Sequence, residues 1–183
     1  MANKKPKQIV VAVSGGFDPI HIGHIRLIKA AKKLGDKLVV ILNNDNWLKK
    51  KKTHIFMHQK ERKEILESIY GVDEVILTDH PRNPKDMSVS KEILKIKPDI
   101  FANGGDRKAE KDILETEACR RVGCKLIFNV GHGGKVQSSS WLLTKYVEKV
   151  KPARKLKVRK ILNELEAVFK GSQIRFPEKL RLK

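Results

Sequence analysis

The sequence predicts an α/β fold, a doubly wound five-stranded parallel sheet followed by a basic helical extension. Two observations predict it. Short apolar segments alternate with segments whose apolar residues recur at helical spacing, a pattern typical of parallel sheets covered by helices on both faces. After Lys151-Pro152 the composition shifts toward lysine and arginine. We therefore expect a domain at residues 1–150 and a basic amphipathic helical tail at 151–183.

The elements follow in order along the domain. Ile9 to Val13 is a β-branched, apolar run that ends in Ser-Gly-Gly, which predicts a buried strand and a tight loop. Gly35-Asp36 ends the first helix. The segment from Asn44 to Phe56 is polar and basic and is expected to be a loop. The predicted strands are 9–13, 37–42, 72–77, 98–102 and 125–130, and the predicted helices are 24–34, 58–70, 89–96, 108–122 and 138–150.

The tail combines charge with one apolar stripe. Residues 151–183 hold 11 lysines and arginines against three glutamates, a net charge of 11 − 3 = +8. Val158, Ile161 and Leu165 recur at helical spacing. The pattern favours a helix packed on the domain or on a second copy in a homo-oligomer, with a dimer expected. Contact with nucleic acid or a membrane surface stays an alternative.

Composition limits the class of protein. The chain has 183 residues and a net charge of +19, which suits polyanionic partners such as nucleotides or nucleic acid. Cys119 and Cys124 form a C-x4-C pair without a second pair, so reduced thiols are expected rather than a zinc site. No apolar stretch approaches the roughly 18 residues of a membrane span. The N-terminus lacks a signal-like apolar region, so we expect a soluble, cytoplasmic protein.

The most informative stretch is GGFDPIHIGH, from Gly15 to His24, between the first strand and the first helix. Ligands of open parallel sheets bind beyond the carboxyl ends of the strands. The glycines Gly15 and Gly16 let backbone N–H groups approach a phosphate closely. His24 falls at a helix N-terminus, which favours anions.

The two histidines suit phosphoryl chemistry. Two residues separate His21 from His24, so both rings can face one phosphate. Gly23, which lies between them, has no side chain that would block the phosphate. Each imidazole can donate a hydrogen bond to a phosphoryl group that gains charge during an in-line attack. Such reactions depend chiefly on positioning and electrostatics, without a protein nucleophile.

This motif resembles the H-x-G-H nucleotidyltransferase superfamily, which has a Rossmann-like fold, over roughly residues 8–150. Two of its branches look most similar to this chain: glycerol-3-phosphate cytidylyltransferases and heptose-1-phosphate adenylyltransferase domains. The resemblance implies that His21 and His24 act on the NTP phosphates and that Phe17-Asp18 belongs to the nucleotide loop. It also implies Mg²⁺, which bridges NTP phosphates.

Three further regions are similar to the superfamily pattern. Lys49 to Lys52 resembles its lysine loop, with Lys51 predicted to act in catalysis, and Arg62 is predicted to hold pyrophosphate oxygens. Gly104, Gly105 and Asp106 resemble the G-G-D element near the nucleotide. The hydroxyl groups that open the last domain helix resemble the phosphate-binding signature, and they belong to Ser138, Ser139 and Ser140.

Together these features predict an enzyme that transfers a nucleoside monophosphate from an NTP to a phosphorylated sugar or alcohol and releases pyrophosphate. The segment 131–137 lacks the arginine that cytidylyltransferases carry there, which favours ATP over CTP. A cytidylyltransferase for a polyol phosphate is the alternative. A non-catalytic nucleic-acid-binding protein on the same scaffold is a more distant one.

Overall fold

The computed structural model describes residues 7–104, 113–131 and 138–170. The chain divides into two compact units, Met1–Ser139 and Ser140–Lys183. The first unit contains the sheet, and the second consists, in its described part, of helix α6, Ser139–Lys170, which begins at the last residue of the first unit. This helix runs through Lys151-Pro152, where the sequence suggested a boundary. None of the helices in the described ranges is long and apolar enough to cross a membrane.

The sheet has five strands, all parallel, in the order β3-β2-β1-β4-β5. The chain therefore builds outward from β1 in one direction and then returns to its other side, which is the doubly wound arrangement that the sequence predicts. The strands are β1 Val10–Gly15, β2 Lys37–Leu42, β3 Glu74–Leu77, β4 Ile100–Ala102 and β5 Lys125–Ile127.

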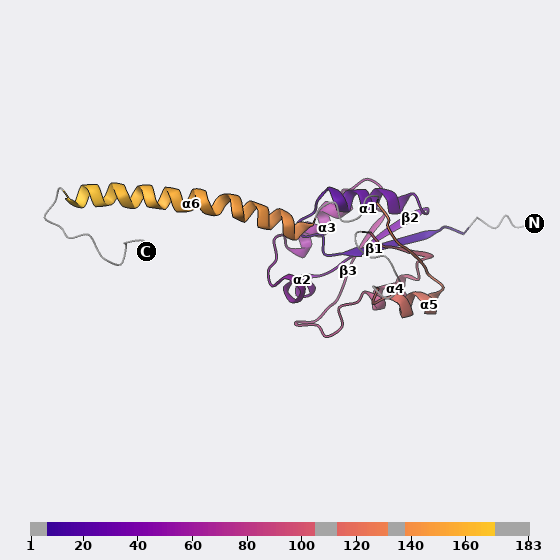
Figure 1. Cartoon of the computed structure of the whole chain (residues 1–183). Helices are drawn as coiled ribbons and strands as arrows, with labels where there is room; N and C mark the ends of the chain where they lie inside the picture. The colour runs from indigo at the N-terminus through magenta and orange to yellow at the C-terminus, as the bar shows by residue number, and fades with distance from the viewer. Residues whose placement is uncertain (1–6, 105–112, 132–137, 171–183) are drawn as a thin grey trace, which may run out of the picture. The chain divides into compact units, whose positions relative to one another are not determined.

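Helices cover both faces of the sheet (Figure 1). One face packs against α1, Ile22–Lys32, and α3, Gln59–Glu67, through core residues such as Ile28 and Leu66. The other face packs against α4, Ser90–Ile96, and α5, Thr116–Val122. Its core includes the two cysteines, which are free and buried. Part of the predicted helix 108–122, residues 108–112, lies outside the described residues.

One predicted element is wrong. The basic segment after β2 is not a loop throughout, because Asp45–Lys52 forms helix α2. The side chain of Asn44 accepts a hydrogen bond from the Trp47 amide and caps the helix, and Leu48 is fully buried. A cap and one buried apolar anchor therefore order a run of four lysines that its composition alone assigns to solvent.

Register aligns the carboxyl ends of three strands at one edge of the sheet. Gly15 pairs with Leu42, and Leu42 pairs with Leu77, so β1, β2 and β3 end at the same level. The residues that follow these strands, Gly16, Asn43 and Thr78, therefore lie along one edge of the sheet.

Candidate active site

The loop after β1 is built by close packing against α2. A Cβ added at Gly16 would lie 2.8 Å from Cδ2 of Leu48, which is closer than a side chain tolerates. A side chain at this position would force the buried Leu48 side chain to shift. At the other side of the site, a Cβ at Gly104 would lie 2.9 Å from the Val130 carbonyl oxygen. At Gly16 the backbone therefore lies close to the Leu48 side chain, and at Gly104 it lies close to the Val130 backbone.

Phe17 and Asp18 shape the loop from within. Phe17 is buried and meets the His24 ring edge-on, with ring centroids 4.9 Å apart. The buried Asp18 carboxylate accepts hydrogen bonds from the backbone amides of Phe56 and Met57, at 2.9 and 2.7 Å. Asp18 thus fastens the segment after α2 to the motif. Within the predicted nucleotide loop, the Asp18 side chain therefore has a structural role.

The motif histidines cap their own helix. The His21 Nδ1 accepts a hydrogen bond from the Gly23 amide at 3.1 Å, and the His24 Nδ1 accepts one from the His21 amide at 3.2 Å. The two rings stack with centroids 3.8 Å apart and planes 22° apart. Because a backbone N–H donates to each Nδ1, the ring proton of each neutral imidazole lies on Nε2.

Electrostatics keep both rings neutral. Burial lowers the pKa of His24 to about 3, with further contributions from His21 and Lys52. Burial and the nearby Lys52 ammonium also lower the pKa of His21. At neutral pH the pair therefore carries no charge and still presents two Nε2–H groups that can donate hydrogen bonds to a phosphate.

The structure selects one lysine from the basic run. The Lys52 Nζ donates a hydrogen bond to the carbonyl oxygen of Asp18 at 2.6 Å. Partial burial lowers the pKa of Lys52, Asp18 opposes this shift and Arg62 adds to it. Lys51, the lysine predicted to be catalytic, is exposed. Lys52 is thus the lysine that α2 brings to the motif, and the run of four lysines does not distinguish it from its neighbours in the sequence.

Arg62 occupies a different place from the predicted one. Its side chain is fully buried and pairs with Asp45 at 2.7 Å. It also donates hydrogen bonds to the carbonyl oxygens of Gly16, Asn43 and Met57, at 2.6, 2.8 and 3.0 Å. Four of the five guanidinium donors are therefore used within the protein. We correct the predicted pyrophosphate contact: Arg62 holds the glycine loop and the end of β2 in position.

The serine cluster is divided by the start of α6. Ser139 is buried, and its hydroxyl donates a hydrogen bond to the Pro19 carbonyl oxygen at 2.8 Å, so it ties the start of α6 to the motif loop. Ser138 is half-buried and Ser140 is exposed. Gly105 and Asp106, the remainder of the predicted G-G-D element, lie outside the described residues.

One buried acceptor at this edge was not predicted. Asn43 follows β2 and is 4% exposed, and its Oδ1 has no hydrogen-bond partner among the described residues. A buried polar atom without a partner is costly unless a ligand supplies one. The signal in the sequence was its place directly after a buried strand. As for metals, the described ranges contain no group of three or more potential metal-binding side chains.

The site thus combines a close-packed glycine loop, two neutral imidazole donors and a nearby lysine at the carboxyl edge of a parallel sheet. Comparison with known proteins agrees with a nucleotide-binding site of this kind, because residues 12–127 match the cytidylyltransferase-like family. The chain belongs to the cytidylyltransferase-like family. Membership makes it a nucleotidyltransferase, and the fold described above is that of the family.

Individual relatives of this family are similar to the chain. It is 38% identical over 121 residues to the FAD synthase of Pyrococcus abyssi, which covers 66% of this chain and 78% of that protein. It is 34% identical over 148 residues to the FAD synthase of Thermococcus sibiricus, covering 79% and 96%. A solved structure, the lipopolysaccharide core biosynthesis protein from Thermoplasma volcanium, superposes with a TM-score of 0.57 at 27% identity, covering 69% of this chain and all of that one.

Proposed function

We propose that this nucleotidyltransferase transfers the adenylyl group of ATP to the phosphate of a small acceptor and releases pyrophosphate. The observation that carries the proposal is the stacked pair His21 and His24. Both rings are neutral, and both present an Nε2–H beside a glycine loop at the sheet edge where ligands bind.

The chemistry follows from this arrangement. An acceptor phosphate oxygen attacks the α-phosphorus of ATP, a new P–O bond forms, and the bond to the pyrophosphate oxygen breaks. Negative charge grows on the phosphoryl oxygens during the step, and the two Nε2–H donors stabilise it. The Lys52 ammonium adds a positive charge near the same loop.

Mg²⁺ belongs to the proposal as a partner of the nucleotide. It would neutralise the charge of the NTP phosphates and of the departing pyrophosphate. Mg²⁺ usually keeps several waters and takes only one or two carboxylates together with substrate phosphates.

The names of the relatives guide the choice of substrates. FAD synthases join an adenylyl group to FMN, which supports ATP as the nucleotide and makes FMN the first acceptor to test. The family description favours CTP as the alternative. A phosphorylated sugar or polyol, as the sequence analysis expects, remains in the acceptor panel.

The test is pyrophosphate release with Mg²⁺ and each of ATP, CTP, GTP and UTP, against FMN, ribose 5-phosphate and glycerol 3-phosphate. We expect turnover with ATP and at least one acceptor, and loss of that turnover in His24→Asn. Preference for CTP would overturn the adenylyl assignment. A folded protein without turnover on any pair would contradict transfer to this class of acceptor.

A further inference from the structure

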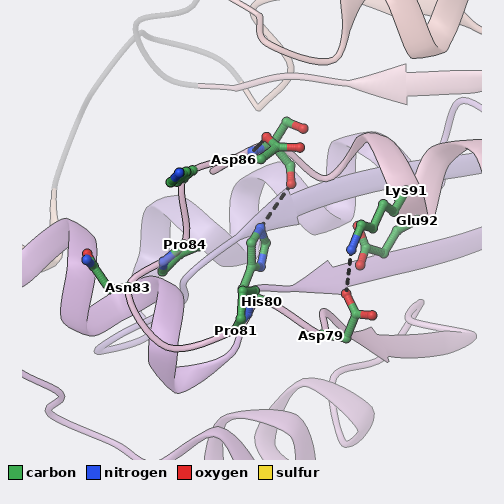
Figure 2. Close-up of a pocket in the computed structure, with 10 residues that line it drawn as sticks. Asp79, His80, Pro81, Asn83, Pro84, Asp86, Lys91 and Glu92 are labelled. Carbon is green, nitrogen blue, oxygen red and sulfur yellow. Dashed lines mark hydrogen bonds and ion pairs between the residues drawn. The ribbon is translucent and has the colours of Figure 1, made fainter.

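A basic hollow lies between helix α2 and the segment that joins β3 to α4. Its volume is about 330 Å³, which is within the range of small-molecule sites. Three cationic side chains and two amides line it, those of Asn46, Lys49, Lys50, Arg82 and Asn83. Figure 2 shows the joining segment, with Asn83 at the end remote from Lys91 and Glu92. None of the lining residues is acidic, so the hollow favours an anionic ligand.

The lysines of this hollow face away from the histidine motif. Leu48 and Lys52 lie on one side of α2, where Leu48 packs beside the glycine loop and Lys52 donates to the Asp18 carbonyl oxygen. Successive residues of an α-helix turn by about 100°, so Lys50, two residues from each of them, faces the opposite side. The hollow is therefore separate from the nucleotide loop, although both lie against the same helix.

Side-chain contacts hold the two walls of the hollow together. The Asn46 Nδ2 donates a hydrogen bond to the His80 carbonyl oxygen at 2.9 Å, and the Lys50 Nζ donates one to the Asn83 Oδ1 at 2.6 Å. Both contacts join α2 to the segment after β3. The walls are therefore in place before any ligand binds, which lowers the entropic cost of binding.

The positive charges of the hollow are not neutralised within the described part of the chain. Every ion pair there joins residues other than its three cations. Two acidic residues close in sequence are engaged elsewhere, since Asp45 pairs with Arg62 at 2.7 Å and Asp79 with Lys91 at 3.7 Å. Like charges around one hollow repel one another, and a bound anion would relieve this repulsion.

The kinds of cation indicate the chemistry of the anion. The guanidinium of Arg82 can bind two phosphoryl oxygens at once, whereas the ammonium groups of Lys49 and Lys50 act as point charges. Three cations that line one hollow suit the adjacent phosphoryl groups of one small molecule. A nucleic-acid backbone is instead followed by a positively charged groove along which its phosphates are spaced.

We propose that this hollow is a second anion site, separate from the nucleotide site, and that it binds the adjacent phosphoryl groups of a small polyphosphate. Lys49 and Lys50 hold the anion from α2, and Arg82 holds it from the opposite wall. A bound polyphosphate would brace α2, the helix that carries Lys52 to the motif loop. Pyrophosphate and inorganic triphosphate share the required chemistry.

The experiment compares two double variants of the full chain. One combines Lys49→Gln with Arg82→Gln, and the control combines Lys29→Gln with Lys33→Gln, two exposed lysines of the α1 region. Both remove two positive charges. Calorimetry measures the binding of pyrophosphate, inorganic triphosphate and a single-stranded oligonucleotide at one ionic strength without Mg²⁺. His24→Asn is included as a variant of the motif.

We expect the Lys49 and Arg82 double variant to keep its melting temperature and to bind pyrophosphate or triphosphate about 10- to 100-fold more weakly than the wild type. The control should change binding by less than about threefold, because salt screens distant charges. His24→Asn should bind as the wild type does. Tighter binding of pyrophosphate than of triphosphate identifies a two-phosphoryl ligand, and the reverse order a longer phosphate chain.

Four results would overturn the proposal. A wild type that binds neither polyphosphate has no such site, and equal losses in the two double variants would reduce the effect to net charge. A loss in His24→Asn as large as that in the Lys49 and Arg82 variant would place the probes at the motif. A loss confined to the oligonucleotide would assign the hollow to nucleic acid. Failure of the proposed function would leave the difference between the two double variants unchanged.

Discussion

The imidazoles of His21 and His24 stack with their centroids 3.8 Å apart while a backbone amide donates to the Nδ1 of each ring. The same hydrogen bonds that cap α1 therefore fix the tautomers of both rings. Helix capping and the presentation of two Nε2–H donors are one arrangement, so both donors are positioned before any ligand binds.

The first prediction concerns the donor of His24. His24→Asn places an amide oxygen where Nδ1 accepts the His21 amide, but it removes the Nε2–H. We expect turnover to fall by about 100- to 1,000-fold, the usual cost of one lost donor to a charged transition state, with little change in melting temperature. Steady-state pyrophosphate release and thermal unfolding measure the two effects. A folded variant with near-native turnover would remove His24 from the mechanism.

The second prediction concerns acid stability. His24 has a pKa of about 3 in the folded protein against an ordinary value of 6.5. Below pH 6.5 the unfolded chain binds a proton that the folded chain does not, so stability is fully present above pH 6.5. It is lost as the pH falls toward 3, by about 1.4 kcal/mol for each pH unit.

Because His24→Asn cannot titrate, it should lose less stability on acidification. We expect the drop in free energy of unfolding between pH 7.5 and 4.5 to be roughly 3 kcal/mol smaller in the variant than in the wild type. Urea unfolding at the two pH values measures it. Equal drops in both proteins would mean that His24 titrates normally in the folded state.

The sequence predicts the sheet and the histidine motif because both are local. An apolar run that ends in Gly15-Gly16 predicts a buried strand followed by a tight loop. The spacing of His21 and His24 places both residues at the start of one helix. The strand ends then meet because parallel strands share an edge.

The lysine and arginine contacts depend on information that no short window contains. Once α2 is helical, each residue turns by about 100°, so neighbouring lysines face different directions and only Lys52 reaches the Asp18 carbonyl. Arg62 binds carbonyl oxygens that are up to 46 residues away in the chain. A buried arginine that positions a loop and an exposed arginine that binds phosphate look the same in sequence.

The third prediction separates the two lysines. Lys52→Ala should reduce kcat/KM for the NTP more than Lys51→Ala does, because only Lys52 is directed to the motif loop. The two variants change the net charge equally, so their comparison cancels long-range electrostatics. The measurement is pyrophosphate release over a range of NTP concentrations. A larger loss in Lys51→Ala would return the catalytic role to the lysine that the sequence analysis selected.

The fourth prediction tests Arg62 as a structural residue. Arg62→Met removes the arginine partner of the Asp45 carboxylate and leaves the carbonyl groups of Gly16, Asn43 and Met57 without its hydrogen bonds. We expect it to lower the free energy of unfolding by about 3–5 kcal/mol. Arg62→Lys should also destabilise the protein, because an ammonium cannot reproduce the guanidinium geometry. Thermal unfolding checks both variants. An Arg62→Met protein with native stability and weakened pyrophosphate binding would instead support a direct ligand contact.

The last prediction concerns the basic tail. In helix α6 the apolar side chains of Val147, Val150 and Ile161 are 44%, 38% and 47% exposed, and Tyr146 is 67% exposed. An isolated amphipathic helix is only marginally stable in water, so we expect this apolar surface to pack against another protein surface. A second copy of the chain is the partner that we expect.

Removing residues 152–183 should therefore lower the oligomeric mass or the melting temperature, while His21, His24 and Lys52 stay in place and pyrophosphate release continues. Light scattering and thermal unfolding of the truncated protein measure this. Unchanged mass and melting temperature would contradict a structural tail. A truncated protein that loses only a salt-sensitive affinity for RNA or DNA would assign the tail to nucleic acid, because phosphate contacts weaken steeply as salt rises.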